Sequence, residues 1–125
     1  MRIIGNLPEE PLEREYGELN TTEVVLNDER IEHILKRHFE DFAYFSEYVK
    51  ETVERPDYIL KDVKNRNTVF LVKKLERTNL NIVVRLSIAL EDEKWRYNSV
   101  MTSYRVCEKN LRKLIDKSKM LYSKE

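Results

Sequence analysis

The sequence is poor in the residues that build disulfide frameworks and glycine-rich loops. Among 125 residues it has one cysteine, two glycines and three prolines. A single cysteine cannot form an intramolecular disulfide, which indicates a reducing compartment, and we expect the protein in the cytoplasm. The two glycines, Gly5 and Gly17, stand apart in the sequence, which excludes a glycine-rich phosphate-binding loop.

Long apolar runs and a net charge are also missing. No stretch approaches the ~18 apolar residues of a transmembrane helix, and the N-terminus turns acidic too early for a signal peptide, so we expect no membrane contact. The 23 basic and 23 acidic residues balance. Because a neutral chain has no global field that attracts polyanions, any nucleic acid must bind to a local cluster.

The sequence does contain enough apolar residues, 41%, for one globular domain over residues 1–125. We expect residues 1–20 to be irregular apart from a short strand at Arg2–Asn6, and residues 21–125 to form the core. Periodicity predicts three helices: Asp28–His38, Asp41–Arg55 and Glu108–Lys119. It predicts five further strands: Thr22–Leu26, Asp57–Asp62, Thr68–Leu75, Leu80–Leu90 and Arg96–Val106. Short turns between the later strands indicate an α+β fold, with helices on a roughly four-stranded antiparallel sheet that leaves one face partly open.

Both histidines lie in the predicted helix Asp28–His38. At about 100° per residue, His38 falls on its apolar face, whereas His33 lies beside that face between Arg30 and Arg37. Two neighbouring cations should lower the pKa of His33. The ordinary interpretation is a packed or capping His38 and a solvated basic stripe. The alternative is a phosphate site, because arginine binds phosphate bidentately and histidine transfers protons near neutral pH.

Polar residues follow one another along the last predicted strand. Strict alternation places Asn98, Thr102 and Tyr104 on one side and Ser99 on the other. They are either ordinary edge-strand residues or a polar row that binds a phosphate and stacks a base. Basic residues from neighbouring strands are expected to join that row: Lys73 and Arg85.

The sequence offers no convincing metal site. The two histidines diverge around their helix, and the acidic run Glu91–Glu93 lies in a predicted turn, where solvated carboxylates are common. We therefore expect neither a metal ion nor another cofactor.

Four segments carry a resemblance to a known family: Val24–His38, Arg55–Ile59, Asn67–Thr68 and Asn98–Thr102. Together they resemble the phage and mobile-element branch of the barnase–EndoU–colicin–RelE-like nucleases, over roughly residues 1–122. The resemblance implies an α+β fold in which helices pack on a four-stranded sheet. It also implies a metal-independent ribonuclease site on that sheet, which drives the RNA 2′-hydroxyl onto the adjacent phosphate and leaves a cyclic phosphate.

The resemblance also implies catalytic residues. His38 and Arg37 match the helix motif, and Ser99 and Thr102 match the polar positions of the last strand. His38 is then the expected general base or acid, with Ser99 and Thr102 on the phosphate oxygens. His33 is a candidate for the second proton carrier.

Substrate binding is expected from five further residues: Arg30, Arg85, Lys73, Tyr104 and Asn98. Arg85 would also stabilise the charge of the phosphorane, and Tyr104 is the other candidate for the second proton carrier. The expected function is a toxin- or phage-associated endoribonuclease that a protein inhibitor controls. The alternative is a non-catalytic module of the same fold that binds RNA or a protein. The sequence carries no signal for the oligomeric state.

Overall fold

The computed structural model describes residues 1–92 and 94–124 of the chain. Glu93, the last residue of the acidic run, lies outside the described residues. The strands are β1 (Arg2–Asn6), β2 (Glu23–Leu26), β3 (Tyr58–Lys61), β4 (Thr68–Lys74), β5 (Asn79–Arg85), β6 (Asn98–Val106) and β7 (Lys119–Ser123). The helices are α1 (Glu9–Tyr16), α2 (Asp28–Arg37), α3 (Phe42–Glu54) and α4 (Glu108–Lys117), with a 3₁₀ turn, η1 (Phe39–Asp41), between α2 and α3.

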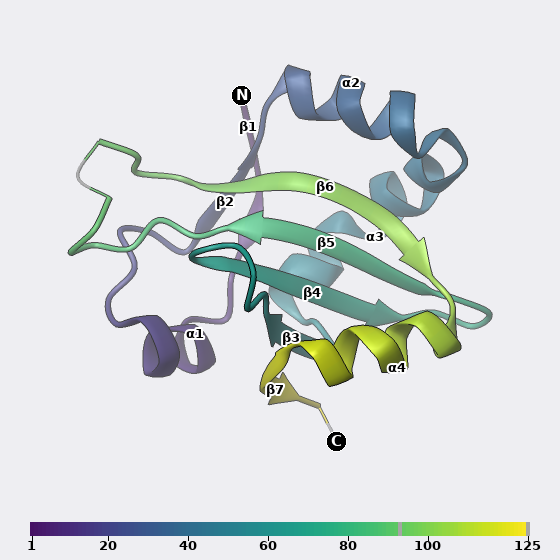
Figure 1. Cartoon of the computed structure of the whole chain (residues 1–125). Coiled ribbons are helices and arrows are strands. Elements are labelled where there is room, and N and C mark those ends of the chain that lie inside the picture. Colours follow the sequence, from purple (N-terminus) through teal and green to yellow (C-terminus); the bar gives the residue numbers. More distant parts are fainter. Residues whose placement is uncertain (93, 125) are drawn as a thin grey trace.

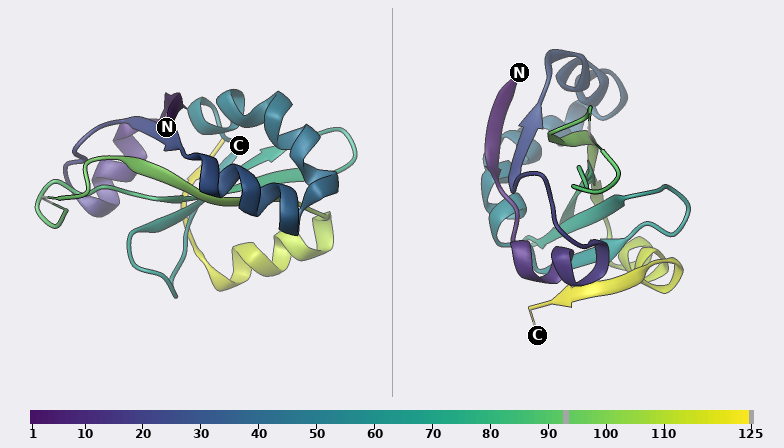
Figure 2. Two further views of the ribbon diagram at one scale, coloured as in Figure 1. Left: turned by 90° about the horizontal axis from the view of Figure 1, so that it is seen from above. Right: turned by 90° about the vertical axis from the view of Figure 1, so that its left-hand side faces the viewer.

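One mixed sheet runs through the molecule, in the order β1-β2-β6-β5-β4-β3-β7 (Figure 1). Neighbouring strands are antiparallel except β2 and β6, which are parallel. Helices α3 and α4 lie on opposite faces of this sheet (Figure 2). No helix in the described ranges is long and apolar enough to cross a membrane.

The main core lies on the α3 face of the sheet. Leu80, Ile82 and Val84, at alternate positions of β5, are fully buried there together with Val53 of α3. Burying one such side chain contributes about 1.5–3 kcal/mol relative to leaving it exposed. This row therefore fixes which face of β5 turns toward α3.

The opposite face is only partly covered. A smaller cluster of buried residues lies there with α4: Leu60, Val72, Val106 and Leu111. Beyond α4 the strands continue without a helix over them (Figure 1). We call this part of the sheet the open face; cross-strand pairing places on it Val83, Arg85, Ser99, Thr102 and Tyr104.

Helix α2 covers the edge of β6 rather than a face of the sheet. Strand β2 pairs with β6 at the first two residues of β6, and α2 lies along the rest of it (Figure 2). Arg30 Nη1 donates to the Met101 carbonyl at 3.4 Å, and Asp41 Oδ2 accepts from the Arg105 amide at 3.1 Å. The helix and η1 thus satisfy backbone groups that an exposed edge would leave unpaired.

Local sequence explains where α2 begins and ends. The Asn27 side chain accepts from the Arg30 amide at 3.1 Å, as expected for an N-cap. Ile34 faces the main core and is fully buried. The helix ends at Arg37, and His38 follows as its C-cap with φ −137°.

The α+β class is confirmed, but the sheet has seven strands in the described part of the chain, not about four. The last helix was expected to reach Lys119 but stops at Lys117, and Lys119–Ser123 forms β7, a strand that was not predicted. Helix α1 forms in the segment expected to be irregular. Pro11 is its third residue, where the missing N–H has no helical partner to lose.

Two strands depart from the predicted alternation. Strand β5 ends at Arg85 instead of continuing to Leu90. In β6, adjacent residues of β5 pair with Thr102 and Val100, so a β-bulge leaves Met101 as an extra residue. The bulge brings Ser99 and Thr102 onto the same face, and the expectation that they lie on opposite faces is wrong.

Asn98 lies on the other face of β6 and joins three segments of the chain. It is fully buried. Its Oδ1 accepts from the Ser87 amide at 2.8 Å, and its Nδ2 donates to the carbonyls of Thr21 and Glu23 at 2.8 and 2.9 Å. Because the protein itself uses these groups, Asn98 is a structural residue and not the substrate-binding residue expected from the sequence.

Replacing Asn98 with alanine should lower the free energy of unfolding by about 2–4 kcal/mol, since buried partners of the amide lose their hydrogen bonds. Urea denaturation of Asn98→Ala measures this. The control is Asn110→Ala on the exposed surface of α4, which should change stability by less than about 0.5 kcal/mol. Equal stability of the two variants would contradict the structural role.

Candidate functional site

The residues predicted for the site fall into two groups at opposite ends of α2. Arg30 lies near Arg85 and Ser99 at the first end, and His38 lies beside Tyr104 at the other. His38 follows Arg30 by eight positions, which corresponds to about 12 Å along a helix axis. The structure therefore does not place His38 and Arg85 on one phosphate, as the sequence led us to expect.

At the first end, a pocket of about 300 Å³ lies between the start of α2 and the start of β6. We call it the Arg30–Arg85 pocket; its lining includes Asn27, Arg30, Arg85, Trp95, Ser99 and Met101. Two guanidinium groups, a hydroxyl and an indole therefore surround one space. Such a set can hold an anion and an aromatic ring.

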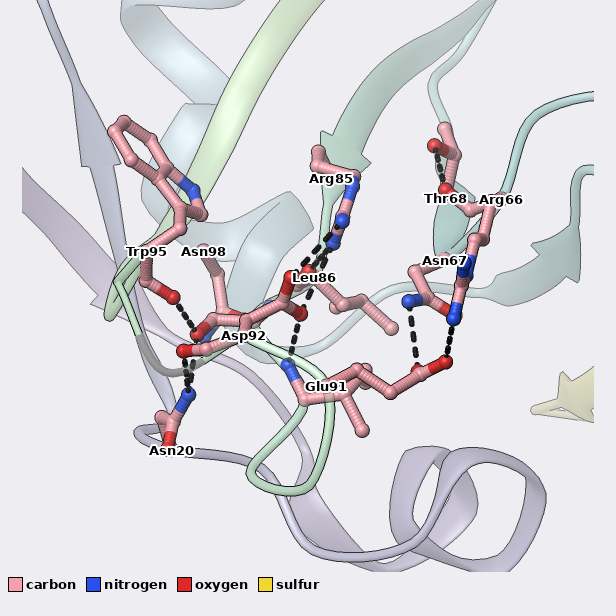
Figure 3. Close-up of polar contacts among 12 residues, drawn as sticks. Asn20, Arg66, Asn67, Thr68, Arg85, Leu86, Glu91, Asp92, Trp95 and Asn98 are labelled. Carbon is pink, nitrogen blue, oxygen red and sulfur yellow. Dashed lines mark hydrogen bonds and ion pairs between the residues drawn. The ribbon is translucent and has the colours of Figure 1, made fainter.

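Asp92 fixes Arg85 at the margin of this pocket (Figure 3). Arg85 Nη2 donates to Asp92 Oδ1 at 3.1 Å, and Asp92 Oδ2 accepts from the Ile88 amide at 2.7 Å. Burial raises the pKa of Asp92, but the hydrogen bonds from Arg85 and the Ile88 amide outweigh it and hold the pKa below its ordinary value. Arg85 is thus positioned and largely neutralised, whereas Arg30 makes no ion pair with any residue in 1–92 or 94–124.

Two hydroxyl groups of β6 have no hydrogen-bond partner among the described residues. They are Ser99 Oγ and Thr102 Oγ1, and both are shielded from solvent. Ser99 is only 6% exposed. Native proteins pair nearly all such groups, so unpaired ones are concentrated where a ligand or a water completes them.

At the other end of α2, His38 is not sealed in apolar packing. Its side chain is 34% exposed, and its ring centroid lies 5.4 Å from that of Tyr104. His38 Nδ1 is 4.0 Å from Asp41 Oδ2, which is within ion-pair range but too long for a hydrogen bond. Arg105 holds Asp41 in place, with 2.5 Å between Arg105 Nε and Asp41 Oδ1. This arrangement can accept and donate a proton.

His33 and Arg37 lie on the outer side of α2. Burial, and next the charges of Arg30 and Arg37, lower the pKa of His33. The direction is the one expected from the sequence, although burial is the larger cause. The exposed Arg37 directly precedes His38, whereas His33 is turned about 140° from His38 around the helix axis.

Lys73 was expected on the open face and lies on the opposite one. In β4 it follows the alternation of Leu71, which faces α3. Lys73 Nζ donates to the Arg55 carbonyl at 3.2 Å and lies 3.6 Å from a Glu51 oxygen. It is therefore outside both groups of site residues.

Sequence reasoning missed Trp95, Asp92 and Met101. Trp95 follows β5 in a loop, where no periodic pattern points to it. Its only signal is that it is the single tryptophan of the chain and precedes a basic residue. In residues 1–92 and 94–124, no group of three His, Cys, Asp or Glu side chains is placed to hold a metal ion.

Replacing Asp92 with asparagine should reduce stability at pH 7 by about 1–3 kcal/mol. The folded pKa of Asp92 lies below its unfolded value. The stabilisation is therefore present above the unfolded pKa, about 4, and is lost as the pH falls through the folded pKa.

Urea denaturation of Asp92→Asn and the parent protein at pH 7 and at pH 3 measures this dependence, with Asp116→Asn on the exposed surface of α4 as control. If the free energies of unfolding of Asp92→Asn and the parent protein differed by the same amount at pH 7 and at pH 3, the role of the Arg85–Asp92 ion pair would be contradicted.

Comparison with known proteins then tests the resemblance. Neither the curated proteins nor the solved structures contain a significant match. The family model described as phage-Barnase-EndoU-ColicinE5/D-RelE like nuclease 3 matches residues 2–113. The match spans α2, the open face and the first part of α4, and it confirms the family inferred from the sequence. The chain belongs to the phage-Barnase-EndoU-ColicinE5/D-RelE like nuclease 3 family.

Proposed function

We propose that the protein is a metal-independent endoribonuclease whose reaction takes place at the His38 end of the open face. The observation that carries this proposal is a partly exposed His38 beside Tyr104, with Asp41 Oδ2 4.0 Å from His38 Nδ1. A partly exposed imidazole is suited to take and return a proton near neutral pH. Membership of a nuclease family supports a nucleic acid as the substrate.

The reaction is a transesterification within the RNA strand. His38 Nε2 takes the proton of a ribose 2′-hydroxyl, and the oxygen attacks the adjacent phosphorus. The bond from phosphorus to the 5′-oxygen of the next nucleotide breaks, and Tyr104 protonates that oxygen. The products are a 2′,3′-cyclic phosphate and a 5′-hydroxyl.

Charge builds on the phosphate oxygens during the attack. Arg37, exposed beside His38, is the cation nearest in sequence to this point. Thr102 contributes a hydroxyl that has no partner among the described residues, two positions from Tyr104 on the same face. Donors fixed in this way stabilise developing charge, which is commonly the largest part of catalysis. Arg85 and Ser99 leave this catalytic set because they lie at the other end of α2.

A ribonuclease of this kind needs control in the cell that makes it. The proposal therefore includes the toxin- or phage-associated role and a protein inhibitor that covers the open face. The alternative, a module of the same fold that binds RNA without cleaving it, has the same open face but no use for a histidine that transfers a proton.

Purified protein incubated with total RNA in excess chelator should cleave it, and His38→Ala should reduce the rate by about 10²-fold or more. The matched control is His33→Ala on the same helix, which should keep the rate within a few-fold. Gel electrophoresis of the RNA over time measures the cleavage rate for the parent protein and for both variants.

Cleavage that needs added magnesium, or that survives in His38→Ala, would overturn the mechanism. RNA that the parent protein binds and leaves intact would identify the non-catalytic module instead.

A further inference from the structure

We infer that the Arg30–Arg85 pocket is a nucleotide subsite, which binds the phosphate and base of a nucleotide flanking the bond that is cleaved. Its part in RNA cleavage rests on the proposed function. Its ability to bind a nucleotide rests on the pocket alone and can be tested without any cleavage.

The phosphate half of the subsite is built by Arg30 and Ser99. Ser99 Oγ has no partner among the described residues, and the residue, only 6% exposed, lines the pocket. The Arg30 guanidinium lines the pocket and, among the described residues, donates one long hydrogen bond of 3.4 Å to the Met101 carbonyl, which leaves further donors of its fork for a ligand. With Arg85 paired to Asp92, Arg30 is the one cation of the pocket without an ion pair among the described residues, which matches the single charge of a phosphodiester.

The base half of the subsite is built by Trp95. Its side chain lines the pocket, and the residue is 46% exposed. Its backbone is nevertheless fixed, because the Ser87 hydroxyl donates to the Trp95 carbonyl (Figure 3). An exposed indole on a held backbone offers a face on which any base can stack. A volume of about 300 Å³ leaves room for a nucleotide rather than for a phosphate alone.

The position of the subsite sets the length of substrate that the enzyme needs. Arg30 lies about 12 Å along α2 from His38. A nucleotide in the pocket is therefore not the one whose phosphate reacts at His38. Substrates long enough to reach both ends of α2 should bind more tightly than a dinucleotide placed at His38.

Fluorescence tests the subsite directly, because Trp95 is the only tryptophan of the chain. Adenosine 5′-monophosphate should quench the emission of the full-length protein and reach saturation. Arg30→Gln and Ser99→Ala should each weaken this binding, Arg30→Gln by about tenfold or more. Lys36→Gln, which removes an exposed cation from the same helix, should bind as the parent does.

Quenching that does not saturate, or that is equal in Arg30→Gln and Lys36→Gln, would overturn the subsite. Equal affinity for inorganic phosphate would also overturn it, because the base would then contribute nothing. Cleavage assays separate this proposal from the proposed function. Arg30→Gln should raise KM for an RNA oligonucleotide, whereas saturable quenching by a protein that cuts no RNA would refute only the proposed function.

Discussion

The buried amide of Asn98 is the interaction on which the arrangement of the site depends. Strand β2 pairs with β6 in parallel at only the first two residues of β6. The Asn98 side chain reinforces this short pairing by hydrogen bonds to the Thr21 and Glu23 carbonyls and to the Ser87 amide. A buried amide with all these partners specifies one geometry, since any slip would leave polar groups unpaired. Because β2 runs directly into α2, this joint determines where α2 lies along β6.

Helix α2 then serves structure and chemistry with the same residues. An unpaired strand edge exposes amides and carbonyls that must be covered or shielded. Arg30 and the Asp41–Arg105 pair cover the edge of β6. These three side chains are charged and lie beside the open face. The edge of β6 therefore carries a row of polar side chains, with His38 at one end. The neutral net charge of the chain does not conflict with this local concentration of cations.

Local patterns were enough to predict the helix that carries the site. Amphipathic spacing and the Asn27 cap defined α2, and the charges beside His33 gave the direction of its pKa shift. Local patterns could not predict pairing between distant segments. They missed the parallel pairing of β2 with β6, strand β7, and the bulge at Met101 that places Ser99 and Thr102 on one face. Lys73 was misplaced because periodicity shows that a strand has two faces but not which one a helix covers.

The central claim is that RNA is cleaved through its own 2′-hydroxyl at the His38 end of the open face. A short RNA with a single cleavable linkage, compared in chelator with the same RNA carrying a 2′-deoxyribose before that linkage, tests it most directly. The account predicts a cyclic phosphate from the first RNA and an intact second RNA. Cleavage of the deoxy-substituted linkage at a comparable rate would contradict it.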